Sequence, residues 1–171
     1  NNVLHLNPKE LNDVRKHLGF LFQGAALYDS MSVRENLEFP LIRHFNFTPK
    51  EREDKVKSVL EKVSLEEAID KMPSELSGGM KKRIGLARSI ISEPKLMLYD
   101  EPTTGLDPIT SKEISSLILE LQKSLNMTSV IVTHDLLCAE IIADRAIVLN
   151  EGIVQHAGTI AELTTSSDHF L

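Results

Sequence analysis

The sequence predicts an α/β protein in which a helical subdomain is inserted into a parallel sheet. Two continuous apolar runs, LMLY at 96–99 and SVIVT at 129–133, are typical of parallel strands that are covered on both faces. The segment between them has helical spacing, with Asp107 as its N-cap and Pro108 at its first position. Strand, helix and strand in this order form a βαβ unit. The apolar residues that this helix is expected to bury are Ile114, Leu117, Ile118, Leu121 and Leu125.

The other elements of the core are predicted in chain order. Asn7 can cap a short helix, and the apolar run LGFLFQ at 18–23 is suited to a buried strand. After the βαβ unit we expect a helix over about 136–143 and a strand at 146–149. The turn NEG at 150–152 then leads into an antiparallel ribbon.

Residues 30–92 are predicted to be mostly helical. The stretch TPKE at 48–51 has the capping-box pattern, and SLEE at 64–67 repeats it. Apolar residues recur at helical spacing after the first box, at Val56, Val59, Leu60 and Val63. We therefore expect two parts, an α-helical subdomain over 30–92 and a core made of 1–29 and 93–171.

Composition narrows the class of protein. The 171 residues are 42% hydrophobic and 26% charged, which is ordinary for a soluble globular protein. The net charge of -6 argues against a nucleic-acid partner, which usually needs a basic face. The single cysteine, Cys138, cannot form an internal disulfide, and it fits a reducing compartment. No run approaches the roughly 18 apolar residues of a membrane span, so we expect a cytosolic protein.

Two acids and a histidine follow the predicted strands. Asp100 and Glu101 come at the end of one strand and His134 at the end of another, so all three should face the same crevice. A hard cation such as Mg²⁺ would use Asp100, directly or through water. Glu101 would then orient and deprotonate an attacking water molecule. The alternative is that these acids only cap the loop that follows.

The segment ELSGGMKKRIGLARSII at 75–91 is a second candidate site. Ser77 can cap the helix that follows, and Gly78 and Gly79 allow another molecule to approach the backbone closely. The free N–H groups of a helix N-terminus bind phosphate. Three basic residues at 81–83 add positive charge. The alternative is a plain loop-to-helix junction with a solvated basic face.

The order and spacing of these motifs resemble the ATP-binding cassette (ABC) ATPases over nearly the whole chain. Gln23 ends a strand, LSGGM and LMLYDEP follow, and a later strand ends in VTHD. The resemblance implies a partial P-loop NTPase (RecA-like) parallel sheet with the ABC α-helical subdomain inserted, and ATP and Mg²⁺ as cofactors.

The resemblance also implies roles for the motif residues. Gln23 is the Q-loop glutamine, which senses Mg²⁺ or water and contacts the transport partner. Asp100 is the Walker B acid that holds the metal, Glu101 is the general base, and His134 is the switch histidine that contacts the γ-phosphate.

The remaining motif residues imply a second subunit. By the same resemblance, Ser77, Gly78 and Gly79 are the signature that clamps the γ-phosphate of an ATP held by that subunit. Asp107 is the acid of the D-loop. The resemblance therefore implies a homodimer of ATPase subunits.

The chain departs from the family pattern at two points. Met80 stands where many members have glutamine, which we expect to matter little. The P-loop pattern G-x-x-x-x-G-K-[ST] occurs nowhere; its nearest match, at 19–24, is followed by Ala25 and Ala26. In the family the P-loop precedes the Q-loop, so we expect it to lie before Asn1, and we expect this chain alone to be inactive.

The absent segment would also supply a strand to the sheet. In the family that strand lies between the ones at 129–133 and 146–149. Without it the sheet must close over the gap, pair with another chain or leave the flanking region disordered, and we expect pairing between copies.

A finer resemblance is to the ATPase subunits of Mla/Mce-type lipid (toluene-tolerance) transporters. It rests on LFQGAALYDSMSVRENLEFPL, LSGGMKKRIGLARSI and DPITSKEISSLILEL. It implies ATP-driven transport of phospholipid or another hydrophobic substrate, with an integral membrane permease as partner. The subunit would be cytoplasmic and peripheral at the inner face of the bacterial inner membrane. Three alternatives stay open: another ABC importer or lipoprotein-release system, a soluble ABC ATPase of DNA repair or translation, and a non-catalytic regulatory fragment.

Overall fold

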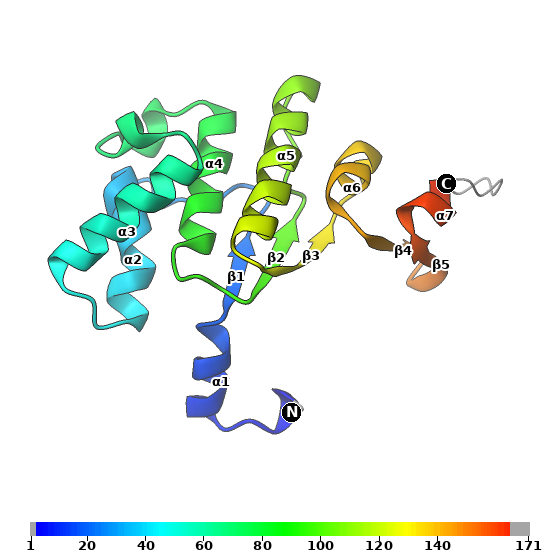
Figure 1. The fold of residues 1–171 in the computed structure, drawn as a ribbon, viewed down its shortest axis with the longest axis horizontal. Coiled ribbons are helices and arrows are strands. Elements are labelled where there is room, and N and C mark those ends of the chain that lie inside the picture. Colours follow the sequence, from blue (N-terminus) through cyan, green and yellow to red (C-terminus); the bar gives the residue numbers. More distant parts are fainter. Residues whose placement is uncertain (1–2, 165–171) are drawn as a thin grey trace.

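The computed structural model of the protein describes residues 3–164 (Figure 1). The α-helices are α1 (Pro8–Arg15), α2 (Val33–His44), α3 (Pro49–Lys62), α4 (Gly78–Ile90), α5 (Pro108–Ser124), α6 (Leu136–Ile142) and α7 (Ile160–Thr164). The strands are β1 (Leu18–Leu21), β2 (Leu96–Asp100), β3 (Thr128–Val132), β4 (Arg145–Asn150) and β5 (Ile153–Thr159). Single 3-10 turns lie at Val3–His5, Glu66–Ala68 and Pro73–Glu75.

The central sheet has three parallel strands in the order β1-β2-β3. Leu96 of β2 pairs with Leu18 of β1 on one side and with Thr128 of β3 on the other. The predicted βαβ unit is confirmed as β2-α5-β3, and the predicted ribbon as the antiparallel pair β4-β5. The carboxyl ends of all three central strands therefore point to the same edge of the sheet.

In residues 3–164, helices cover one face of this sheet and leave the other open. Leu21, Met97 and Tyr99 lie on one face of the sheet and are buried. Figure 1 shows α4 and α5 running alongside the strands. The opposite face remains open: side chains of Val130 and Val132 are 52% and 61% exposed. The prediction that the strands are covered on both faces is therefore wrong for the described residues, because α4, α5 and α6 all lie on the first side.

The helix starts follow their capping signals with one exception. The predicted caps at Asn7 and Thr48 are confirmed, each as part of a complete capping box. The box predicted at 64–67 is wrong. Ser64 has a φ of 55°, in the left-handed region, and the short turn that follows has no side-chain cap. Ser64 thus ends α3 rather than starting a new helix.

The strand β3 has one open edge in residues 3–164. There it pairs with β2 alone, and β4 pairs with β5 in a separate sheet. Closure of the sheet over the gap is therefore not what the structure contains, and pairing between copies stays a prediction. In the same residues no helix combines the length and the apolar character needed to cross a membrane.

Candidate functional site

The carboxyl edge of the sheet brings together two of the predicted catalytic side chains. Nδ1 of His134, after β3, lies 2.8 Å from Oε1 of Glu101, after β2. The main-chain N–H of Glu101 donates to the carbonyl oxygen of Val132 at 2.9 Å, which extends the pairing of β2 with β3. The prediction that the strand ends place Glu101 and His134 at one edge is confirmed, and their roles stay predictions.

Glu101 is held in an uncommon conformation with both carboxylate oxygens engaged. Its φ of 49° lies in the left-handed region, which non-glycine residues rarely adopt. Oε2 accepts a hydrogen bond from the hydroxyl of Thr104 at 3.0 Å. Burial opposes ionisation of the carboxyl, but the hydrogen bonds from His134 and Thr104 outweigh it and hold the pKa of Glu101 below its ordinary value. Glu101 is therefore ionised at neutral pH, the form that can accept a proton from water.

The contact between Glu101 and His134 sets a pH window. The pKa of Glu101 lies below its ordinary 4.5, so its contribution to stability is present above pH 4.5 and is lost as the pH falls through the folded-state value. The hydrogen bond to Glu101 raises the pKa of His134 above its ordinary 6.5. The contribution of His134 is therefore present below pH 6.5 and is lost as the pH rises through the folded-state value.

Titration of the His134 ring by NMR measures this pairing. In the parent chain we expect a pKa above 6.5, and in Glu101→Gln a return toward 6.5, because the neutral amide no longer favours the imidazolium. A His134 pKa that does not respond to Glu101→Gln would contradict the contact.

Asp100 is a half-buried carboxylate that ends β2. In residues 3–164 its side chain makes no hydrogen bond and no ion pair, and it lies on the open face of the sheet in register with Val132. The described residues do not gather three metal-ligating side chains anywhere. Mg²⁺ in nucleotide sites uses one or two carboxylates together with phosphate oxygens and water. A single free carboxylate therefore fits Mg²⁺ that arrives with a nucleotide.

Lys82 is a residue of the site that sequence reasoning missed. The alternative of a solvated basic face fails at this position, because Lys82 is only 5% exposed. Its ammonium donates to the carbonyl oxygen of Glu101 at 3.1 Å and to that of Gln23. Burial is the main cause that holds the pKa of Lys82 below its ordinary value, and the charges of Asp100 and Glu101 oppose it without reversing it. Lys82 precedes the buried Leu86 by one helical turn, and this spacing was the signal available in the sequence.

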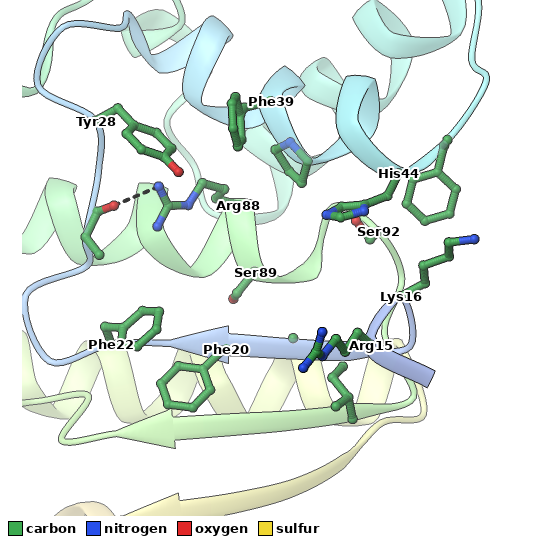
Figure 2. Close-up of a pocket in the computed structure, with 15 residues that line it drawn as sticks. Arg15, Lys16, Phe20, Phe22, Tyr28, Phe39, His44, Arg88, Ser89 and Ser92 are labelled. Atoms are coloured by element: carbon green, nitrogen blue, oxygen red, sulfur yellow. Dashed lines mark hydrogen bonds between the residues drawn. The ribbon is translucent and has the colours of Figure 1, made fainter. Parts of the chain in front are cut away.

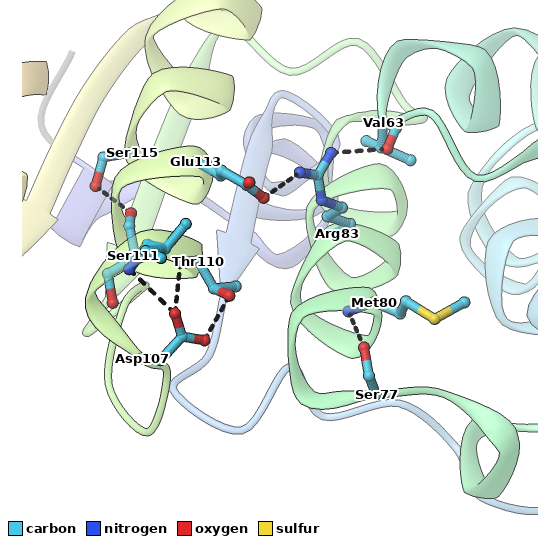
Figure 3. Close-up of polar contacts among 10 residues, drawn as sticks. Val63, Ser77, Met80, Arg83, Asp107, Thr110, Ser111, Glu113 and Ser115 are labelled. Atoms are coloured by element: carbon cyan, nitrogen blue, oxygen red, sulfur yellow. Dashed lines mark hydrogen bonds and ion pairs between the residues drawn. The ribbon is translucent and has the colours of Figure 1, made fainter.

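The alternative of a solvated basic face also fails at Arg83. The guanidinium of Arg83 donates to the carbonyl oxygen of Val63 at 3.3 Å and pairs with Glu113 of α5 at 3.1 Å (Figure 3). It therefore ties α4 to its neighbours instead of adding free positive charge beside the glycines.

Gln23 lies just beyond β1 in an exposed turn. In the described structure its side chain makes no hydrogen bond, and its carbonyl oxygen accepts from Lys82. The next residues, Ala25 and Ala26, have φ values of 61° and 48°. Their carbonyl oxygens accept hydrogen bonds from Arg88 of α4 at 3.0 Å and 2.8 Å. The turn is thus fixed by α4, while the amide of Gln23 stays available.

Ser77, Gly78 and Gly79 form the start of α4, where Ser77 and Gly78 are exposed and Gly79 is half-buried. Oγ of Ser77 accepts from the main-chain N–H of Met80 at 3.2 Å (Figure 3). A Cβ on Gly79 would lie 2.9 Å from Cγ2 of Thr110, so glycine allows the starts of α4 and α5 to approach. Across residues 3–164, no hydrogen bond or ion pair links this segment to Glu101 or His134.

Asp107 is the N-cap of α5, and the start of α5 lies beside the start of α4. Oδ1 of Asp107 accepts from the main-chain N–H groups of Ile109 and Thr110, both at 3.0 Å, and Oδ2 accepts from the hydroxyl of Thr110 at 2.6 Å (Figure 3). The hydroxyl of Thr110 is the main cause that holds the pKa of Asp107 below its ordinary value. The predicted N-cap is confirmed, and its carboxylate is occupied within its own helix.

A hollow of about 430 Å³ lies beside the Gln23 turn, between β1, α2 and α4 (Figure 2). Its aromatic and basic lining includes Phe20, Phe22, Tyr28, Phe39, Arg15, Lys16 and Arg88. The ring centroids of Tyr28 and Phe39 are 5.0 Å apart, and the guanidinium of Arg88 lies 5.7 Å from the Tyr28 centroid. Sequence reasoning missed this hollow because its residues come from separate segments that no motif links.

Comparison with known families and proteins agrees with the motifs. The family model for the ABC transporter matches residues 2–104. The chain is 42% identical over 166 residues to the intermembrane phospholipid transport system ATP-binding protein MlaF of Haemophilus influenzae, covering 97% of this chain and 63% of that protein. It is 38% identical over 168 residues to the methionine import ATP-binding protein MetN of Carboxydothermus hydrogenoformans, covering 98% and 49%. The chain thus spans about half to two thirds of the length of these relatives.

Solved structures share the fold. CbiO1 from Clostridium perfringens, part of the ABC transporter complex cbiONQ, superimposes with a TM-score of 0.85 at 32% identity, over 92% of this chain and 63% of that one. A dimeric post-hydrolysis state of the ATP-binding cassette MJ0796, bound to ADP and Pi, gives a TM-score of 0.79 at 32% identity, over 91% and 68%.

Proposed function

Because the chain belongs to the ABC transporter family, we propose that it is part of an ATP-hydrolysing subunit that drives transport across a membrane. The observation that carries the proposal is the pairing of an ionised Glu101 with His134 at the carboxyl edge of a parallel sheet. Ligands of open parallel sheets bind at this edge. The proposal also keeps the division into a helical subdomain at 30–92 and a core at 1–29 and 93–171.

The proposed mechanism divides the work among the residues of the edge. Asp100 would hold Mg²⁺, which supplies positive charge to the phosphates of ATP, and Gln23 would reach the same metal or its water. Glu101 would accept the proton of the attacking water, because its pKa keeps it ionised. His134 would orient that carboxylate and donate to the γ-phosphate from its exposed side.

We propose a second copy of the subunit as the first partner. Ser77, Gly78 and Gly79 offer an exposed helix start with free N–H groups, suited to the γ-phosphate of an ATP held by that copy. Asp107 would lie next to this contact. The dimeric form of the cassette MJ0796 supports the arrangement.

An integral membrane permease is the second proposed partner. The hollow beside the Gln23 turn would receive a segment of the permease, because its aromatic walls offer apolar contact area next to a residue of the nucleotide site. The subunit would then sit at the cytoplasmic face of the bacterial inner membrane as a peripheral protein. The relatives' names place them in transport systems, which supports this partner.

Phospholipid, or another hydrophobic molecule, is the proposed substrate class. The 42% identity to MlaF supports it, and the 38% identity to MetN supports methionine import as the second candidate. Co-purification with membrane proteins would support either, whereas co-purification with ribosomes or DNA would favour a non-transport ABC ATPase. Vesicle assays that compare phospholipid with methionine would decide between the two substrates.

Stabilisation by Mg-ATP tests the proposed activity. We call a protein in which a P-loop segment precedes Asn1 the extended protein. At 100 times its dissociation constant a ligand stabilises by about 2.7 kcal/mol, which raises the Tm of a domain of this size by roughly 5–10 °C. We expect this shift for the extended protein and no shift for the 171-residue chain. A clear shift for the chain alone, or none for the extended protein, would contradict the proposal.

A further inference from the structure

Lys82 joins two segments of main chain that are far apart in the sequence. Lys82 lies in α4 and is 5% exposed, and its ammonium donates to the carbonyl oxygens of Gln23 and Glu101. A buried ammonium is retained where hydrogen bonds replace its lost hydration. Both acceptors are main-chain carbonyl oxygens, so Lys82 constrains the position of the backbone at Gln23 and at Glu101.

The carbonyl of Glu101 belongs to a residue whose backbone conformation is unfavourable for any amino acid other than glycine. Glu101 is left-handed, with a φ of 49°, and that conformation directs its carboxylate to His134 at 2.8 Å and to Thr104 at 3.0 Å. If the peptide rotated toward ordinary φ values, the carboxylate would leave both partners. The hydrogen bond from Lys82 at 3.1 Å opposes this rotation.

The carbonyl of Gln23 starts a turn that α4 holds along its length. A Cβ on Gly85 would lie 2.9 Å from Cβ of Ala25, so the turn packs against α4 at a glycine that leaves room for it. Arg88 holds the carbonyl oxygens of Ala25 and Ala26. With α4 fixed on the turn, Lys82 is the group that connects the turn to Glu101.

We propose that Lys82 is a positioning residue that fixes the main chain of Glu101 relative to that of Gln23, so that the two side chains keep a constant separation at the nucleotide site. The proposal rests on the proposed function for its consequence in catalysis. Lys82 touches no reacting group by this account, and it acts through the backbone of Glu101.

The His134 ring provides a readout whose sign separates positioning from simple electrostatics. Lys82→Met keeps the length and apolar packing of the side chain but removes the ammonium. Loss of a nearby positive charge alone would raise the pKa of His134. Loss of positioning would instead release Glu101 from His134 and lower that pKa toward 6.5. Lys81→Met, at the adjacent and more exposed lysine of α4, is the matched control.

The NMR titration is done on the 171-residue chain. We expect His134 to titrate toward 6.5 in Lys82→Met and to keep its raised pKa in Lys81→Met. An unchanged or higher pKa in Lys82→Met would overturn the proposal. Should Lys82→Met fail to fold, the parent chain decides: the ¹⁵N-labelled ammonium of Lys82 should couple across hydrogen bonds to the carbonyl carbons of both Gln23 and Glu101. Coupling to one or neither would overturn it.

Kinetics of the extended protein separate this proposal from the proposed function. We expect Lys82→Met to lower kcat for ATP about 10- to 100-fold with little change in KM, because a displaced general base slows chemistry more than binding. A parent protein without ATPase activity would contradict the proposed function and leave the NMR result to decide on Lys82. An active parent whose kcat is unaffected by Lys82→Met would overturn the positioning role.

Discussion

In the extended protein, Glu101→Gln is expected to lower ATP turnover by about 10²–10⁴-fold, the range for loss of a general base. The amide keeps the size of the side chain and can still bond Thr104 and His134, so the site should keep its shape. Binding of Mg-ATP should therefore persist, and the ATP-bound dimer should accumulate. Phosphate release gives the turnover, and equilibrium binding of a fluorescent ATP analogue gives the affinity.

Asp100→Asn is the matched control for this prediction. It also exchanges one carboxylate for an amide at the end of β2, one residue earlier. We expect it to weaken binding of Mg-ATP itself, because Asp100 is the carboxylate left free for the metal. If both variants lost affinity for Mg-ATP equally, the division of roles between Asp100 and Glu101 would be wrong.

Gly19→Ala is expected to have the largest effect on folding. Gly19 pairs with Met97 in the sheet and lies beneath α4. A Cβ there would lie 2.6 Å from the carbonyl oxygen of Ser89 and would also meet Sδ of Met97. Methionine can move aside, but a carbonyl of α4 can move only with its helix. Overpacking of this kind costs about 1–3 kcal/mol, which lowers the Tm by roughly 2–12 °C.

Gly24→Ala is the control, since no atom lies within 4 Å of a Cβ at Gly24. We expect its free energy of unfolding to change by less than about 0.5 kcal/mol. Urea unfolding followed by circular dichroism measures both variants. Equal stability of the Gly19→Ala and parent chains would contradict the packing of α4 on β1.

Local signals in the sequence were enough for most of the fold. The caps at Asn7, Thr48 and Asp107 each supply a side-chain acceptor to free N–H groups, and each starts a helix where predicted. The ABC fold and family that the motif order predicted are confirmed by the family match and by the solved cassettes.

Tertiary context explains where the sequence reasoning failed. SLEE has the letters of a capping box, but Ser64 adopts the left-handed conformation that ends α3 and therefore caps no new helix. The continuous apolar run of β3 predicted two covered faces, yet apolar composition cannot say which elements are present to cover them.

Only those residues of the site that follow the ends of strands could be predicted from the sequence. Glu101 and His134 follow adjacent parallel strands, and that alone places them at one edge. Lys82 looked like one of three solvated charges, because the sequence does not reveal that its partners are main-chain oxygens 59 and 19 residues away. The hollow beside the Gln23 turn depends on the packing of α2 against α4 and has no local signal.

The central claim is that Glu101 acts in hydrolysis at a site that Ser77–Gly79 of a second copy closes. The mass of the extended Glu101→Gln protein in Mg-ATP tests this claim most directly. Light scattering should report a dimer in Mg-ATP and a monomer in Mg-ADP, and adding Ser77→Arg should abolish the dimer by blocking the start of α4. A protein that binds Mg-ATP yet remains a monomer would contradict the claim.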